Sequence, residues 1–134
     1  MKKVNLIISA VLLAFLFSSC EKCEEECDLV AAKVIRYDCD RVIIQMLTSD
    51  IIGDSNWEDV QTGQRYSNVV SYYNTCKIQK LTKGKKIKIY VELKELTGDA
   101  KNRDCVQCEA VSQNPPQTVV DFAKISKEGC GIQF

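Results

Sequence analysis

A strict alternation of apolar and polar side chains over nine residues of the segment Lys86–Leu96 most constrains the fold of this chain. Ile87, Ile89, Val91 and Leu93 are separated from one another by single residues that are charged or amphipathic. Successive side chains of a β-strand point to opposite faces, so a period of two indicates a strand with one buried face. A helix would scatter the same four side chains around its circumference. The segment therefore predicts a central strand with these four side chains pointing inward.

Further runs rich in β-branched and aromatic residues predict strands at Leu29–Tyr37, Arg41–Leu47, Tyr66–Tyr73 and Thr118–Ile125. The short segments Asp38–Asp40 and Lys83–Lys85 predict turns, and the prolines of Asn114–Pro116 mark a loop that cannot join a strand ladder. No window after residue 28 shows a long apolar period of 3.6 residues. Five or six strands in about 100 residues suit a small, mostly antiparallel barrel, closed or partly open.

The N-terminal segment, residues 1–19, has the features of a bacterial lipoprotein signal peptide. Lys2 and Lys3 give a short positive start, Leu6–Phe17 is an almost uninterrupted apolar run, and small residues directly precede Cys20. Residues 17–20 resemble a lipobox, although Phe17 stands where leucine is more usual. The resemblance implies cleavage before Cys20 and attachment of several acyl chains to that residue, which exceeds the threshold for stable membrane anchoring.

Two other interpretations of this segment stay open. A transmembrane anchor is disfavoured because Val4–Phe17 is shorter than the roughly 20 apolar residues that a bilayer core requires. An ordinary secretory signal would need a small-x-small cleavage site, which is not convincing here. The lipoprotein interpretation is favoured, and it places the protein in a Gram-negative cell envelope. There it would be lipid-anchored to the outer membrane, on the periplasmic or the outer side.

Removal of the signal peptide leaves an acidic tether, residues 20–28, followed by a single domain, residues 29–134. The remaining 115 residues are too few for two ordinary domains. Glu21–Asp28 carries five acids against one lysine and no large apolar side chain, which indicates a solvated spacer. Acids in this position also resemble the surface-export signals of some Gram-negative lipoproteins.

The eight cysteines predict a disulfide-stapled fold in an oxidising compartment. Lipidation would use Cys20 and leave seven that can form disulfides: Cys23, Cys27, Cys39, Cys76, Cys105, Cys108 and Cys130. Because seven is odd, at least one thiol is expected to be free or bonded to another chain. Spacing alone does not define the connectivity.

Composition disfavours several kinds of activity. The mature chain has a net charge of −2 and no basic block, which argues against nucleic acid as a partner. The absence of histidine removes the commonest general base and the usual imidazole metal ligands, so no enzyme activity and no cofactor are expected.

Two interpretations other than structural disulfides remain for the cysteines. The Cys-x-x-Cys pair of Cys105 and Cys108 could be a redox dithiol, although no helix follows it that would favour the thiolate. Together with Cys23 and Cys27, the same pair would have the ligand number and type of a structural zinc site. Structural disulfides are favoured over both interpretations in an oxidising compartment.

Carboxylates and aromatic residues complete the candidates for function. Asp38 and Asp40 flank Cys39 and are expected to be solvated turn residues rather than an acid/base pair. An aromatic binding surface would be built from Trp57, Tyr66, Tyr72 and Tyr73. The alternative, in which Trp57 and one tyrosine are buried as a cap on the end of the barrel, is favoured.

The motifs of this chain stand in a recognisable order. They are the Asp38-Cys39 turn, the segment Tyr66–Val70, the Lys83–Ile87 lead into the long strand, and Cys108 eight residues before Pro116. Over Leu29–Ile125, this order resembles small exported bacterial lipoproteins with an OB-like β-barrel, a family largely without assigned activity. The extra cysteines Cys76, Cys105 and Cys130 depart from the pattern. The resemblance implies a five- to six-stranded barrel and a disulfide between Cys39 and Cys108.

These features together favour a membrane-anchored, non-enzymatic binding or structural module of the cell envelope, with a protein or a glycan as ligand. A metal-binding or thiol-redox lipoprotein that uses the surplus cysteines is the alternative, and a small hydrolase ranks third.

Peptide mapping of the non-reduced protein tests the cysteine expectations. A peptide that joins Cys39 to Cys108 is expected, and such a bridge would close a loop of about 70 residues and contribute roughly 4 kcal/mol on the chain-entropy model. A bridge between Cys105 and Cys108 would contradict this pairing. Alkylation before reduction should count at most one free thiol, whereas four or more would favour the metal or redox alternative.

Overall fold

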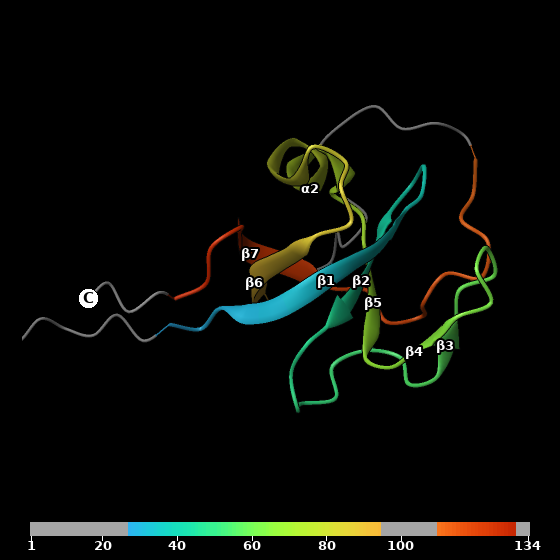
Figure 1. Cartoon of the computed structure of the whole chain (residues 1–134), viewed down its shortest axis with the longest axis horizontal. Coiled ribbons are helices and arrows are strands. Elements are labelled where there is room, and N and C mark those ends of the chain that lie inside the picture. The colour runs from blue at the N-terminus through green and yellow to red at the C-terminus, as the bar shows by residue number, and fades with distance from the viewer. Residues whose placement is uncertain (1–26, 95–109, 131–134) are drawn as a thin grey trace, which may run out of the picture.

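The computed structural model describes residues 27–94 and 110–130 (Figure 1). In chain order, the elements are β1 (Val30–Tyr37), β2 (Val42–Met46), β3 (Trp57–Glu58), β4 (Arg65–Tyr66), β5 (Val69–Tyr72), α2 (Thr75–Thr82), β6 (Lys88–Lys94) and β7 (Asp121–Ser126). The predicted mostly antiparallel β domain is confirmed. Within the described residues, no helix has the length and apolar character needed to cross a membrane.

The five long strands form one antiparallel sheet in the order β5-β2-β1-β6-β7. The strand β1 is the centre of the sheet and pairs with β2 on one side and with β6 on the other. The predicted turn between the first two strands is confirmed by a hydrogen bond from Asp38 N to Arg41 O of 2.8 Å. The long alternating segment forms β6, an internal strand between β1 and β7, as predicted.

A single parallel bridge links β5 to the residues that lead into β7. Ser71 N donates to Thr118 O at 2.8 Å, and Val120 N donates to Ser71 O at 3.0 Å. Thr118 and Val119 were predicted to begin the last strand, but β7 starts only at Asp121. The bridge does not extend into a ladder, so of the closed or partly open barrel that was expected, the closed form is not made by continuous strand pairing in the described residues.

The inner face of the sheet carries the main hydrophobic core, which α2 helps to cover (Figure 1). Ile78 of this helix is fully buried in the core, and Leu81 packs against it. Sequence periodicity missed the helix because its eight residues are too short for a sustained apolar repeat. The helix ends at Lys83, which has a left-handed conformation (φ 54°), and Gly84 follows with φ 71°, so the predicted turn is confirmed.

A β-bulge in β1 creates a second, smaller core on the outer face of the sheet. The pairing with β2 shifts between Val34 and Arg36, which gives two consecutive residues, Ile35 and Arg36, to the outer face. Ile35 packs there with Ile43 of β2 and with Trp57, which lies on the two-stranded β3–β4 hairpin. The hairpin therefore covers the outer face of the sheet, opposite the main core.

One of the four residues predicted to point inward from β6 is exposed. Ile89 and Val91 are fully buried and Ile87 packs at the edge of the core, whereas Leu93 is 36% exposed. The pairing of β6 with β7 shifts between Glu92 and Leu93, and the pairing with β1 has already ended at Val91. The extra residue at this shift is Ala123 of β7, so β6 itself keeps its alternation. Leu93 is exposed because it lies beyond Val91, the last residue of β6 that pairs with β1.

Truncation of two β6 residues tests this assignment. Ile89→Ala should lower the free energy of unfolding by about 2–4 kcal/mol, because it removes fully buried methylenes and leaves a cavity. The matched change Leu93→Ala should cost less than about 1 kcal/mol, since much of that side chain already meets solvent. Denaturant melts of the mature chain measure both values. Equal losses of unfolding free energy in the two variants would show that Leu93 is covered as well and would contradict its assignment as exposed.

Candidate functional site

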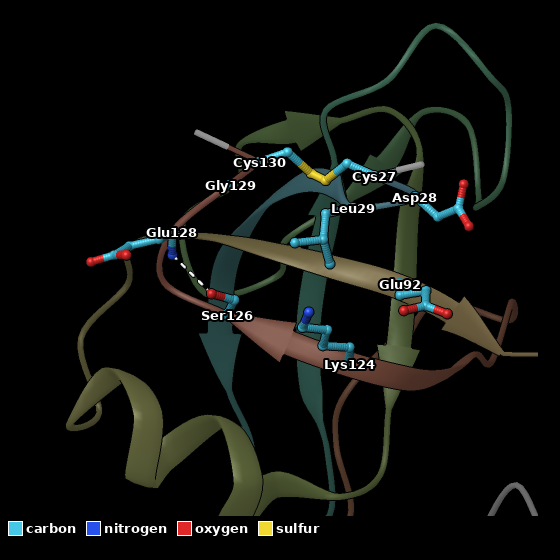
Figure 2. A pocket seen from close by; sticks show the side chains of 9 residues that line it. All are labelled: Cys27, Asp28, Leu29, Glu92, Lys124, Ser126, Glu128, Gly129 and Cys130. Carbon is cyan, nitrogen blue, oxygen red and sulfur yellow. Dashed lines mark hydrogen bonds between the residues drawn. A yellow bond between two sulfur atoms is a disulfide. The ribbon is translucent and has the colours of Figure 1, made fainter. Parts of the chain in front are cut away.

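A groove lies at the end of the sheet where the two ends of the described chain meet (Figure 2). The disulfide between Cys27 and Cys130 forms one wall, and the strands β6 and β7 form the floor. The hollow measures about 580 Å³. Its lining residues come from the segment before β1, from the two strands and from the C-terminal segment: Cys27, Asp28, Leu29, Glu92, Lys124, Ser126, Glu128, Gly129 and Cys130.

The C-terminal segment lies over β6, with Gly129 close against the ring of Tyr90. A Cβ atom on Gly129 would lie 2.7 Å from Cε1 of Tyr90, a residue of β6. One step earlier, Glu128 N donates a 3.0 Å hydrogen bond to Ser126 Oγ, which turns the chain back over the end of β7 (Figure 2). Together with the disulfide, these contacts define the wall of the groove, which we call the clamp.

Charged side chains give the groove a mixed but net negative character. Glu92 and Lys124 are direct neighbours in the β6–β7 register, and Asp28 and Glu128 add two further carboxylates at the rim. The lining contains carboxylates and one ammonium group, and its two cysteines are joined in a disulfide. This set of groups suits recognition of a charged or polar surface, because it offers ion pairs and hydrogen bonds without an activated nucleophile.

A buried ionic cluster lies at the opposite end of β1, around Arg36, and fixes the outer face of the domain. The guanidinium donates to Asp38 at 2.8 and 2.9 Å, to Asp59, and to Gln113 O at 2.9 Å. Ser112 donates to Asp38 as well, and the guanidinium carbon lies 5.5 Å from the ring centroid of Trp57. We call these residues the Arg36 cluster. It joins β1, the β3–β4 hairpin and the loop at residues 110–114.

Asp54 and Asp59 are held as carboxylates by donors from their own neighbourhoods. Burial raises the pKa of Asp54, but the Thr118 hydroxyl and the N–H groups of Gln117 and Thr118 outweigh this effect and lower the pKa. Burial likewise opposes the ionised form of Asp59, and donors from Thr62, Gln61 and Arg36 lower its pKa below the ordinary value. Each carboxylate therefore stabilises a loop through its charged form.

The four aromatic candidates do not form an exposed binding surface. Trp57, Tyr72 and Tyr73 are 6%, 1% and 6% exposed, and only Tyr66 is half-buried. Tyr72 stacks obliquely on Phe122 in the main core, and Arg41 lies 4.9 Å over the ring of Tyr73. Trp57 covers the outer face of the sheet and donates to Asn114 O at 2.8 Å. Large apolar area drives this burial. The alternative was right that these residues are buried, but Trp57 covers the outer face of the sheet and not the end of a barrel, and two tyrosines are buried instead of one.

The prediction for the two aspartates of the first turn is also wrong. Asp38 and Asp40 were expected to be solvated, but Asp38 belongs to the Arg36 cluster, and Asp40 pairs with Arg41 at 2.6 Å in a buried ion pair. Neither arginine was singled out from the sequence. The only local signal for the cluster was the Asp59-x-x-Thr62 spacing, which is typical of a turn in which the aspartate accepts from following residues.

The cysteines in the described residues are disulfide-bonded without exception: Cys27, Cys39, Cys76 and Cys130. The disulfide of Cys27 to Cys130 attaches to the domain a residue that was expected to belong to the solvated tether. It also removes Cys27 from the hypothetical zinc ligand set, because a disulfide sulfur cannot act as a thiolate ligand. Cys20, Cys23, Cys105 and Cys108 lie outside the described residues, so the Cys-x-x-Cys pair of Cys105 and Cys108 does as well.

Within the described parts of the chain, no group of three or more histidine, cysteine, aspartate or glutamate residues is arranged to hold a metal ion. Comparisons with protein-family models, with curated proteins and with solved structures find no match for this chain. Its function is therefore inferred from its own residues.

Asp54 should make the stability of the domain depend on pH. Its pKa is lower in the folded than in the unfolded chain, so its contribution is complete above the unfolded value of about 3.9 and is lost as the pH falls through the lower, folded value. Asp54→Asn should therefore be less stable than the parent protein at pH 7, and the difference should shrink as the pH falls below about 4. Chemical denaturation across this pH range measures the effect, with Asp50→Asn at an exposed position as the control.

Proposed function

We propose that this protein is a lipid-anchored, non-enzymatic binding module of the bacterial cell envelope. The observation that carries the proposal is the disulfide bonding of every cysteine in the described residues. Disulfides persist in oxidising compartments and are rare in a reducing cytosol, so this bonding supports export of the chain. Export agrees with a signal peptide at residues 1–19 and with acylation of Cys20, which would retain the exported protein at a membrane.

The proposed location is the outer membrane of a Gram-negative cell. The acidic residues that follow Cys20 support a position on the outer face, and a simple solvated spacer would suit the periplasmic face equally well. In either case, the membrane is the first partner, and it is reached through the lipid on Cys20.

We also infer that the sheet is an OB-like barrel that is closed by few contacts. In such a fold, five strands pair in the order found here, and the third and fifth strands meet in parallel. The strands β5 and β7 take these two positions, and the Ser71–Val119 bridge supports the parallel contact between them. The helix between β5 and β6 agrees with this topology as well.

If the domain is OB-like, the face on which OB-folds usually bind ligands is covered in this protein. OB-folds bind ligands on the face of their second and third strands and on adjacent loops. Here the outer face of β2 and β5 is covered by the β3–β4 hairpin, with Trp57 packed on Ile43 and Val69. The groove beside the clamp is therefore the favoured binding site, and its mixed charges suit a protein segment or a polar glycan.

Acyl labelling tests the proposal. With Cys20→Ala, we expect the precursor to accumulate with residues 1–19 attached, with loss of radiolabelled fatty acid and of the membrane-bound pool. Cys23→Ala is the matched control, because it removes a nearby cysteine and leaves the lipobox-like segment intact. Unchanged labelling and membrane retention of the Cys20→Ala variant would contradict the proposal.

A further inference from the structure

Three of the exposed large apolar side chains lie at the same end of the sheet as the clamp. They are Leu47, Ile51 and Leu93, which are 43%, 87% and 36% exposed. A hydrogen bond fixes the position of Leu47: its N–H donates to the carbonyl oxygen of Ala31, near the start of β1, at 2.8 Å. Leu93 lies two residues beyond Val91, which pairs with Val30 at the first position of β1.

Ile51 is presented by a loop that one side chain holds in place. Asn68, in a left-handed conformation with φ 58°, accepts hydrogen bonds from Ile52 N and Gly53 N at 2.7 and 2.8 Å. Its amide nitrogen donates to Asp50 O at 2.8 Å and to Met46 O at 3.3 Å. A loop fixed on both sides of Ile51 pays little additional ordering cost when that side chain enters another apolar environment.

Gly53 strengthens this arrangement. A Cβ atom at this position would collide with the backbone carbonyl of Val69, so the loop lies directly against β5. The exposure of Ile51 is therefore imposed by a packed loop and is not the exposure of a loose chain end.

The proposed lipid anchor restricts what this end of the domain can meet. The step from Cys20 to Cys27 is seven residues, which span at most about 25 Å when fully extended. The disulfide of Cys27 to Cys130 prevents the segment before β1 from separating from the end of β7. The turn at residues 38–41 lies at the opposite end of β1, about 25 Å along the strand from Val30, since a strand rises about 3.3 Å per residue.

We propose that the clamp end of the domain docks on the bilayer that holds the anchor, with Leu47, Ile51 and Leu93 in the interfacial region. This inference rests on the proposed lipidation of Cys20. The partner is a zwitterionic phospholipid surface, which of the two proposed locations only the periplasmic face of the outer membrane offers. Anionic headgroups would repel the adjacent groove, which carries Asp28, Glu92 and Glu128 against Lys124. Three side chains alone bind a membrane weakly, but the anchor supplies a high local concentration.

Fluorescence quenching of the full mature lipoprotein in phosphatidylcholine vesicles with brominated acyl chains tests the docking. Ile51→Trp is compared with Val111→Trp, because Val111 is 78% exposed and lines a different hollow beside Asp38 at the far end of β1. The unsubstituted protein supplies the background of Trp57. We expect brominated lipid to quench the added emission of Ile51→Trp at least threefold more than that of Val111→Trp. Replacement of half the lipid by phosphatidylglycerol should reduce this difference.

Equal quenching of the two added tryptophans would overturn the docking inference, as would an unchanged or greater difference with the anionic lipid. Mass spectrometry of the same samples separates this outcome from failure of the proposed function. An acylated Cys20 with unquenched Ile51→Trp overturns the docking alone, whereas an unacylated Cys20 in protein that does not remain with the vesicles overturns both.

Discussion

The buried guanidinium of Arg36 is the interaction on which the outer half of this domain depends. The guanidinium binds Asp38 directly after β1, Asp59 in the β3–β4 hairpin and the backbone carbonyl of Gln113. A charge this deeply buried is costly unless it is paired, and removal of one partner from such a pair typically costs about 3–5 kcal/mol. The end of β1 and two segments distant in sequence therefore meet at one point, because each of them satisfies the same buried cation.

The β-bulge makes this arrangement possible. Without the shift between Val34 and Arg36, strict alternation would place Arg36 on the apolar inner face. The bulge instead turns Ile35 and Arg36 together toward the hairpin, one to pack under Trp57 and the other to bind Asp59. The hydrophobic and ionic contacts of the outer face thus arise from one irregularity in a single strand.

The two ends of β1 have different physical characters, and this asymmetry organises the proposed function. At the far end, the Arg36 cluster and the Asp40–Arg41 pair bury charge and order the loops. At the near end, the clamp joins the first and last described residues, and apolar side chains remain exposed beside a charged groove. A short anchor attached to the near end would present that surface to a membrane and direct the ionic end away from it.

The sequence by itself determined the features that depend on neighbouring residues: the alternation that forms β6, the turns at Asp38–Asp40 and Lys83–Lys85, and the β class of the domain. These follow from side-chain period and turn chemistry, which act within a few residues. Only the tertiary structure decided the exposure of Leu93, the burial of Tyr72 and the ion pairs of Arg36, because these depend on where strand pairing ends and on partners up to 77 residues away. The disulfide of Cys27 to Cys130, over a separation of 103 residues, has the same origin, since spacing carries no information on which cysteines the fold brings together.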